Sequence, residues 1–450
     1  IFPAAVLLVL ICELFVLDYP SLWYRESPTR NQVATEYYND GTKEAVAMLK
    51  EQDDSVYRIE KSYTSASEND GMSQGYNGLS VYMSTNPASL VAYHKMYGPE
   101  TLSGNFVDFN MDDYIRSSLL GTKYLITGTG YHAPQKIYTS VGEAGGRSVF
   151  ENQYALPFGY LYDKEWNQEE VKEMSGLDKT LASLSGFYYT DAEETSSYQK
   201  ADLPEQTDLS LLDYADTATD CTMEKGSEGI TVSNLGADPN VVFPGVASCF
   251  ADNDKLYGLS LTVDAPDETE MAVYYQTEGD EGFSAEKVYT FKVTEDNRTW
   301  EHLVPGGITE LRVDVSSPVE SAVINNFELK SCDITESGYT ALKESGVDEV
   351  TFSDSTYQAQ VTNDASENKM LCVPLFYQKG WTAQIDGEDA GVYNINEGMC
   401  GVEVPSGTHE IVLKYETPYQ NYGVGMTIIG IIIFILAFSQ NLYKFFVKLC

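Results

Sequence analysis

The sequence predicts a β-rich α+β fold, in which several compact domains lie between two apolar segments. Three observations support this class. A chain of 450 residues is long enough to form two to four hydrophobic cores. Apolar residues follow a helical spacing over much of the first 190 residues, and a spacing of two from about residue 232 onward. Apolar runs occupy both ends, at 1–17 and 422–438.

These patterns divide the chain into seven segments. They are a truncated transmembrane helix at 1–17, an extracytoplasmic α+β domain at 18–189, an acidic linker at 190–231, a jelly-roll-like antiparallel β-sandwich at 232–333, a small β domain at 334–419, a transmembrane helix at 420–438 and a cytoplasmic tail at 439–450. The tail contains Lys444 and Lys448, so the positive-inside tendency predicts that residues of about 18–420 are extracytoplasmic. Because the chain begins inside an apolar run, we expect further helices before it.

The first domain is predicted to mix helices with strands. Apolar residues at helical spacing predict four helices, at 42–51, 87–97, 111–120 and 164–186. Runs rich in β-formers predict strands at 56–60, 123–127 and on both sides of Pro157. The last helix is the longest, and its apolar residues give it an amphipathic pattern.

Two β modules follow the acidic linker. Stretches such as LYGLSLTVDAP, MAVYYQT and LRVDVSS alternate apolar and polar residues and are separated by acidic or Gly-rich turns. This pattern is typical of an antiparallel sandwich or jelly roll. The last module, at 349–415, has the same period, and Asp386-Gly387 is its strongest hairpin signal.

Composition excludes several classes of function. A formal net charge of −40, with 28 Lys and Arg against 68 Asp and Glu, excludes a nucleic-acid partner. The acids are read either as a solvated surface or as sites for cations, and Asp252 and Asp254 are calcium candidates. The seven cysteines have no CxxC spacing, which gives no support for zinc. The sequence leaves two disulfide pairings possible, Cys372 with Cys400 and Cys249 with Cys332.

Several short motifs stand out along the sequence. They are Tyr57-Arg58-Ile59-Glu60, Asn77-Gly78, Leu119–Leu125, Glu151-Asn152 with Ala155-Leu156-Pro157, Gly380-Trp381, Asp386-Gly387, and His409 leading into Lys414-Tyr415. Together they resemble the motifs of one bacterial membrane protein family, YfhO. The motifs stand in family-like order and cover about half the chain. We interpret ten residues of these motifs as structural: Tyr57, Arg58, Asn77, Gly78, Gly380, Trp381, Asp386, Gly387, His409 and Tyr415.

The resemblance implies a membrane glycosyltransferase of the C superfamily that acts on cell-envelope polymers, with teichoic-acid-type glycosylation as the family role. It implies a polyprenyl-phosphate sugar donor for the full-length protein, and a lipid bilayer, a wall polymer and the missing N-terminal membrane part as partners. The catalytic carboxylate of that superfamily belongs to an early outer loop, which this chain lacks. Asp18 is a very weak substitute, since it follows what would be one of the last helices.

The sandwich supplies the candidates for glycan binding. Sugars are bound by aromatic faces together with polar groups for their hydroxyls, and Tyr274, Tyr275, Trp300 and Arg312 offer both. The structural alternative places Tyr275 and Trp300 in the core and pairs Arg312 with Asp314. We expect this region to recognise the acceptor or to support the membrane core. The alternative function is a non-enzymatic, membrane-anchored envelope protein that binds glycan through its sandwich.

Overall fold

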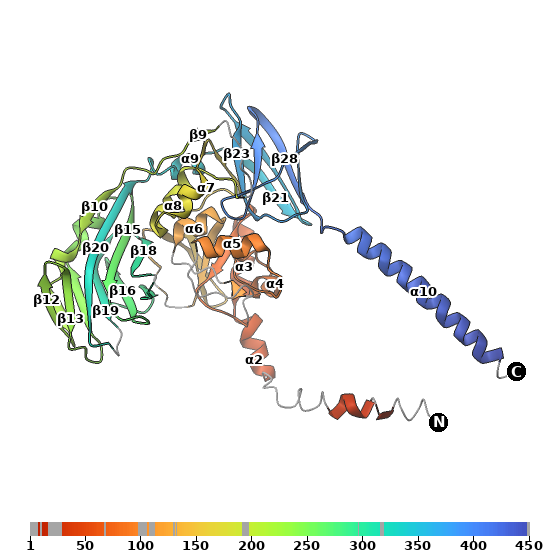
Figure 1. Ribbon diagram of the computed structural model, residues 1–450, viewed down its shortest axis with the longest axis horizontal. Coiled ribbons are helices and arrows are strands. Elements are labelled where there is room, and N and C mark those ends of the chain that lie inside the picture. The colour runs from red at the N-terminus through yellow and green to blue at the C-terminus, as the bar shows by residue number, and fades with distance from the viewer. Residues whose placement is uncertain are drawn as a thin grey trace.

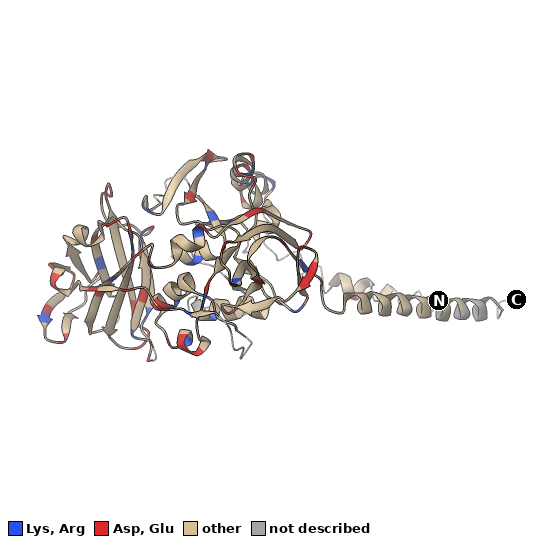
Figure 2. Cartoon of the chain, turned by 90° about the horizontal axis from the view of Figure 1, so that it is seen from above, with Lys and Arg blue, Asp and Glu red and all other residues tan. Residues whose placement is uncertain are grey.

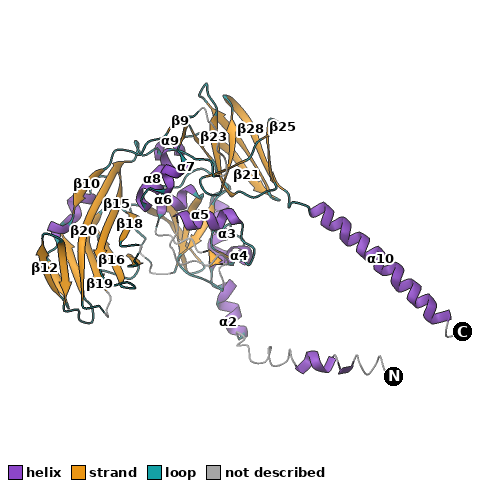
Figure 3. Ribbon diagram, in the orientation of Figure 1, coloured by secondary structure: helices purple, strands orange, loops and turns teal. Residues whose placement is uncertain are grey.

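Strands dominate the computed structural model, and they form three β assemblies along the chain (Figure 1). The structure describes residues 8–9, 11–16, 29–66, 69–97, 106–107, 113–128, 131, 133–190, 198–295, 297–315 and 319–447. Helices gather between the sandwich and the C-terminal strands (Figure 3). The predicted β-rich α+β class is therefore confirmed.

The first assembly is a four-stranded sheet in the order β1-β4-β6-β5, covered by α3. Its strands are β1 (Arg58–Lys61), β4 (Thr122–Thr127), β5 (Tyr138–Ala144) and β6 (Arg147–Asn152). The helices of this region are α2 (Arg30–Thr35), α3 (Thr42–Gln52), α4 (Asp70–Gln74), α5 (Ala88–Tyr97) and α6 (Tyr114–Leu119), with the 3-10 turn η1 (Tyr37–Asn39). A two-stranded ribbon joins β2 (Val81–Tyr82) to β3 (Phe106–Val107). The predicted helices at 42–51 and 87–97 are confirmed. The helix predicted at 111–120 is observed as α6, which begins after its N-cap Asp113, and residues 111–112 lie outside the described residues.

The single helix predicted at 164–186 is wrong. This segment forms β8 (Lys164–Glu165), α7 (Gln168–Lys172) and α8 (Gly176–Ser185), and β8 pairs with β9 (Gln199–Lys200). Asn167 and Ser175 each accept hydrogen bonds from the first backbone N–H groups of a helix, so each begins a new one. The apolar spacing continues across the break, which hides it from the sequence pattern.

The second assembly is the predicted sandwich of two antiparallel sheets. The six-stranded sheet contains β10 (Thr207–Ser210), β12 (Thr222–Gly226), β13 (Gly229–Ser233), β15 (Lys255–Asp264), β18 (Thr299–Val304) and β20 (Ser321–Asp333). The five-stranded sheet contains β11 (Thr217–Thr219), β14 (Asn240–Pro244), β16 (Glu270–Thr277), β17 (Val288–Lys292) and β19 (Ile308–Val315). The short 3-10 turns are η2 (Leu212–Tyr214) and η3 (Val246–Phe250).

The sandwich begins before the predicted boundary at residue 232. Four strands, β10 to β13, start within the segment predicted as an acidic linker, and they pair with β20, β14 and each other. The strands β10 and β12 lie at the margin of the six-stranded sheet, and their residues are mostly exposed and polar. This polarity explains why the sequence resembles a linker.

The third assembly combines two sheets, β21-β22-β28-β24-β25 and β26-β27-β23-β7. Its strands are β7 (Tyr160–Tyr162), β21 (Val347–Ser353), β22 (Thr356–Asn363), β23 (Lys369–Phe376), β24 (Trp381–Ile385), β25 (Glu388–Ala390), β26 (Tyr393–Ile395), β27 (Met399–Val404) and β28 (Gly407–Tyr415). The strand β7 belongs to the predicted first domain, and it pairs with β23 through Tyr160 and Cys372. The small β domain is therefore completed by an earlier part of the chain.

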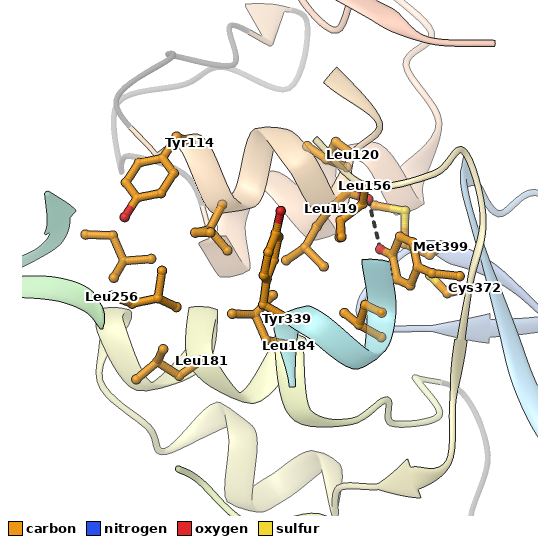
Figure 4. Close-up of a cluster of buried hydrophobic side chains, with 14 of the residues drawn as sticks. Tyr114, Leu119, Leu120, Leu156, Leu181, Leu184, Leu256, Tyr339, Cys372 and Met399 are labelled. Atoms are coloured by element: carbon orange, nitrogen blue, oxygen red, sulfur yellow. Dashed lines mark hydrogen bonds between the residues drawn. The ribbon is translucent and has the colours of Figure 1, made fainter. Parts of the chain in front are cut away.

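One hydrophobic cluster joins the three assemblies (Figure 4). It contains Leu181 of α8, Leu256 of β15 and Cys372 of β23, together with Tyr339 of the helix α9 (Tyr339–Lys343). All of these side chains are buried. Shared burial of apolar surface holds the sandwich and the C-terminal strands against the first domain.

A buried ion pair ties β1 to α4. The ammonium of Lys61 lies 2.8 Å from a carboxylate oxygen of Asp70, and about 5% of each side chain is exposed. Ser65 and Gln74 accept further hydrogen bonds from Lys61. The charges are thus paired and hydrogen-bonded, as burial requires.

Neither disulfide left open by the sequence is present, because Cys249, Cys332, Cys372 and Cys400 are free thiols. Neighbouring residues of paired strands alternate between faces. Cys372 therefore lies in the cluster of Figure 4, whereas Cys400 lies in the core of the β22–β28 sheet. Burial raises the pKa of the Cys372 thiol to about 12, so this thiol stays protonated.

The last helix, α10 (Gln420–Val447), extends away from the β assemblies (Figure 1). Within the part of the chain that the structure describes, no helix combines the length and apolarity needed to cross a membrane. The spans at 1–17 and 420–438 stay predictions.

Candidate functional site

Tyr274 and Arg312, two of the four predicted glycan-binding residues, meet on the outer face of the five-stranded sheet. They stand directly opposite each other on β16 and β19. The Arg312 guanidinium carbon lies 5.3 Å from the centre of the Tyr274 ring and 6.0 Å from the centre of the Phe283 ring. The two rings lie 6.5 Å apart in an edge-to-face arrangement. An arginine and two aromatic rings therefore share one surface.

Strand alternation explains why Tyr274 is available and its neighbours are not. Val273 and Tyr275 point into the sandwich core, so Tyr274 points outward and stays half-buried. Arg312 flanks the ring on the β19 side. On the edge-strand side only Val288, a short side chain, stands opposite the ring. That side of the tyrosine is the more open one.

Two carboxylates fix the position of Arg312. Its Nε and Nη2 atoms donate to the two oxygens of Asp314 at 2.6 and 2.7 Å, and Nη2 also donates to Asp238 at 2.7 Å. These hydrogen bonds raise the pKa of Arg312 above its ordinary value. Burial raises the pKa of Asp314, and the hydrogen bonds from Arg312 act in the opposite direction. The fork geometry makes this a preorganised, charge-assisted pair. We call the surface formed by Tyr274, Phe283, Arg312, Asp314 and Asp238 the Tyr274 face.

A second ion pair holds the loop that carries Phe283. Lys287 donates to both oxygens of Asp280, at 2.8 and 2.7 Å, and to the hydroxyl of Thr277. Burial alone would raise the pKa of Asp280, but hydrogen bonds from Lys287 and Thr277 outweigh it and lower that pKa. Phe283 was missed from the sequence, although a lone aromatic in the acidic stretch GDEGFSAEK was a usable signal.

Tyr275 and Trp300 lie elsewhere in the sandwich. Tyr275 is buried in the core and stacks on Tyr289, with ring centres 5.7 Å apart. Trp300 lies at the open edge between β17 and β18, where it stacks on Phe291 at 5.8 Å and an interplanar angle of 12°. The structure thus separates the four predicted residues, and only Tyr274 and Arg312 come together.

The first domain packs against the opposite sheet of the sandwich. Leu177 of α8 lies so close to Gly258 that an added Cβ atom would come within 2.4 Å of it. The N–H of Leu177 also donates to Glu301 at 3.5 Å, and Glu301 pairs with Lys330. These residues belong to the outer face of the six-stranded sheet. The Tyr274 face, on the other sheet, points away from the first domain.

The two calcium candidates, Asp252 and Asp254, gain no metal site among the described residues. Asp252 accepts a hydrogen bond from the N–H of Asp254 at 3.0 Å, as in a simple turn. Among the described residues, no group of three or more His, Cys, Asp and Glu side chains is arranged to hold a metal ion. Asp18 lies outside the described residues.

The motif residues near the start of the chain support β1. The N–H of Ile59 donates to the carbonyl of Asn77, whose side chain donates to Tyr57; Gly78 follows in the same loop. Arg58 is buried, with its guanidinium carbon 5.1 Å from the centre of the Phe158 ring and a hydrogen bond to the carbonyl of Leu120. Burial lowers the pKa of Arg58 to about 10. These contacts match a structural anchor.

The C-terminal motif residues shape turns in the last module. Asp386 and Gly387 have φ values of 52° and 85°, which fit the expected two-residue hairpin. His409 lies 2.7 Å from Asp386 beside this turn. Trp381 lies at the other end of β24, away from this hairpin.

That other end is packed around Tyr415. The Trp381 and Tyr415 rings have centres 5.4 Å apart, and the indole N–H donates to Phe376. Gly380 has a φ of 128°, and an added Cβ would lie 2.3 Å from the Glu416 carbonyl oxygen. The tight backbone approach explains why glycine stands here.

Comparison with known proteins identifies relatives of this chain. The family model described as "Bacterial membrane protein YfhO" matches residues 3–427. The chain is also 21% identical over 431 residues to the uncharacterized protein YfhO of Bacillus subtilis (strain 168). The match covers 91% of this chain and 46% of that protein, so the chain spans about half of its relative's length.

Some solved structures show weaker likeness. The C-terminal CBM6 of LamC, a marine laminarinase from Zobellia galactanivorans, is 13% identical with a TM-score of 0.18, covering 29% of this chain and 100% of that one. The arabinofuranosyltransferase AftD from Mycobacteria is 14% identical with a TM-score of 0.16, covering 37% of this chain and 13% of that one. Likeness at these TM-scores does not establish a shared function.

Proposed function

We propose that this chain, which belongs to the YfhO family of bacterial membrane proteins, is part of a membrane glycosyltransferase and that its sandwich binds the glycan acceptor. The Tyr274 face carries this proposal. It combines two aromatic rings with a fixed guanidinium and two carboxylates on one outward surface. Aromatic faces suit the C–H patches of sugars, and the polar groups suit their hydroxyls.

The position of the face supports the same role. Since the first domain covers the opposite sheet, a long polymer can reach Tyr274 without meeting that domain. Arg312 is held by Asp314 before any ligand arrives, which lowers the entropic cost of binding. The transfer chemistry itself is proposed for the half of the protein that this chain does not span.

The remaining parts of the proposal come from the family resemblance. The sugar donor would be linked to polyprenyl phosphate, and the acceptor would be a cell-envelope polymer of the teichoic-acid type. Residues of about 18–420 would lie outside the cytoplasm, between the two predicted spans.

A glycan array probed with the purified 450-residue chain tests the binding role. We expect binding to at least one wall glycan, and a loss of at least tenfold in affinity for Tyr274→Ala and for Phe283→Ala, equal to about 1.4 kcal/mol. Tyr82→Ala is the matched control, because Tyr82 is 57% exposed in the first domain. Equal binding by the Tyr274 and Tyr82 variants, with circular dichroism unchanged, would reject the proposal.

A further inference from the structure

The charge of the sandwich restricts what the Tyr274 face can bind. Residues 207–333 contain 25 Asp and Glu but only 7 Lys and Arg. The positions of Asp and Glu, coloured red in Figure 2, are spread over the sandwich. A ligand of negative charge approaches this surface against a repulsive field, which is screened beyond about 10 Å at 0.1 M salt.

Both cations in the strands of the five-stranded sheet are already paired. Arg312 is held by Asp314 and Asp238, and Lys292 pairs with Glu268. Within the described strands of this sheet, neither cation is left without a carboxylate partner. Phosphate is normally bound by the two-pronged fork of an arginine, and here Asp314 occupies that fork.

The neighbouring loop adds no counter-charge. Lys287 is almost fully buried, with 6% of its side chain exposed, and it is held by Asp280. Lys287 is thus fixed inside the loop that carries Phe283 and does not reach a ligand on the surface. On the exposed surface, Asp238 offers an acceptor for hydroxyl groups, since 59% of its side chain is exposed.

From these contacts we infer that the Tyr274 face selects uncharged saccharide units and rejects phosphate-bearing ones. The inference rests on the proposed function, since it assigns a ligand class to the same face. The rings of Tyr274 and Phe283 stack on the sugar, while Asp238 accepts hydrogen bonds from its hydroxyls. A phosphate placed beside Arg312 would have to displace Asp314 or lie next to two carboxylates. In a polymer with a phosphate backbone, the sandwich therefore binds the sugar substituents and not the backbone.

Calorimetric titration of the full 450-residue chain tests this selectivity. The probes are uncharged trisaccharides of glucose, galactose and N-acetylglucosamine, each compared with its 6-phosphorylated counterpart at 50 and 300 mM NaCl. We expect at least one uncharged trisaccharide to bind, and its phosphorylated form to bind at least tenfold more weakly at 50 mM. The ratio of the two affinities, uncharged over phosphorylated, should be smaller at 300 mM NaCl, because salt screens the repulsion between the phosphate and the acidic surface.

Charge reversal at the face supplies a second measurement. Asp238→Lys removes one carboxylate from Arg312 and adds a cation. The ratio of the affinity for the uncharged trisaccharide to that for its phosphorylated form should therefore fall at least threefold. Asp54→Lys makes the same change in charge at an exposed position of the first domain and should leave the ratio unchanged.

The outcomes separate the inference from the proposed function. Binding of the phosphorylated form as tight as, or tighter than, the uncharged form would overturn the inference and leave glycan binding intact. An Asp54 variant that narrows the ratio as much as the Asp238 variant would also overturn it, because the selectivity would then come from total charge. Absence of binding to every trisaccharide would overturn both.

Discussion

The hydroxyl of Tyr357 is expected to couple the C-terminal module to the first domain. It donates a hydrogen bond to the carbonyl of Phe158 at 3.0 Å, and Tyr357 is fully buried. Tyr357→Phe deletes this oxygen without changing the packing of the ring. A buried carbonyl left without its partner costs about 1–3 kcal/mol. We expect urea unfolding to show a loss in the free energy of unfolding of about 1–2 kcal/mol with an unchanged m-value.

The same change should appear in thermal and exchange measurements. For a cooperative unit of about 150–250 residues, such a loss lowers Tm by about 2–8 °C. The substitution should increase the amide exchange rates of β22 and β28 more than those of the sandwich, since the lost hydrogen bond anchors only the C-terminal module. Tyr82→Phe is the control, because this exposed tyrosine lies in the first domain. If Tyr357→Phe were no more destabilising than Tyr82→Phe, the hydroxyl would not couple the two parts.

Three further predictions follow from other contacts. The hydrogen bond to Asp386 raises the pKa of His409 above 6.5. The stability that this contact contributes is therefore fully present below about pH 6.5 and is lost as pH rises through the folded-state pKa. In an NMR titration of the Asp386→Asn variant, the pKa of His409 should fall back toward 6.5. Gly258→Val drives a Cβ into Leu177 and should cost about 1–3 kcal/mol, part of which Leu177→Ala should restore in the double variant, as measured by denaturation. Asp70→Asn removes the charge that neutralises a buried lysine and should cost about 3–5 kcal/mol in the same measurement, whereas a cost below 1 kcal/mol would show that the lysine is not held by charge.

Several strands of the sandwich could be predicted because each of them alternates apolar and polar residues, whereas the polarity of β10 and β12 hid them within the predicted linker. In MAVYYQT the alternation alone shows that Val273 and Tyr275 share one face and Tyr274 the other. Helix boundaries were harder to predict, since Asn167 and Ser175 each begin a helix inside a continuous apolar pattern. Caps act on backbone hydrogen bonds, which a pattern of apolar residues does not report.

Contacts between distant segments could not be predicted in the same way. The pairing of Tyr160 with Cys372 joins strands from two predicted domains, and neither strand carries a local sign of its partner. The strand β7 has three residues, all buried, and such a short run has no periodicity to interpret. The predicted domain boundaries treated these parts as separate because sequence patterns describe elements and not their partners.

The candidate face shows where prediction from sequence stops and why. Alternation places Tyr274 and Arg312 on outward faces, but only the register of β16 against β19 brings them opposite each other. Phe283 joins them because Lys287 and Asp280 close its loop, which is a contact between charges and not a periodic pattern. Asp314 follows Arg312 by two residues on β19, so strand alternation, and not register, places both on one face, where Asp314 binds the Nε and Nη2 atoms of the guanidinium. Register therefore brings Tyr274 opposite Arg312, alternation supplies the carboxylate that competes with phosphate for Arg312, and the inferred ligand selectivity depends on both.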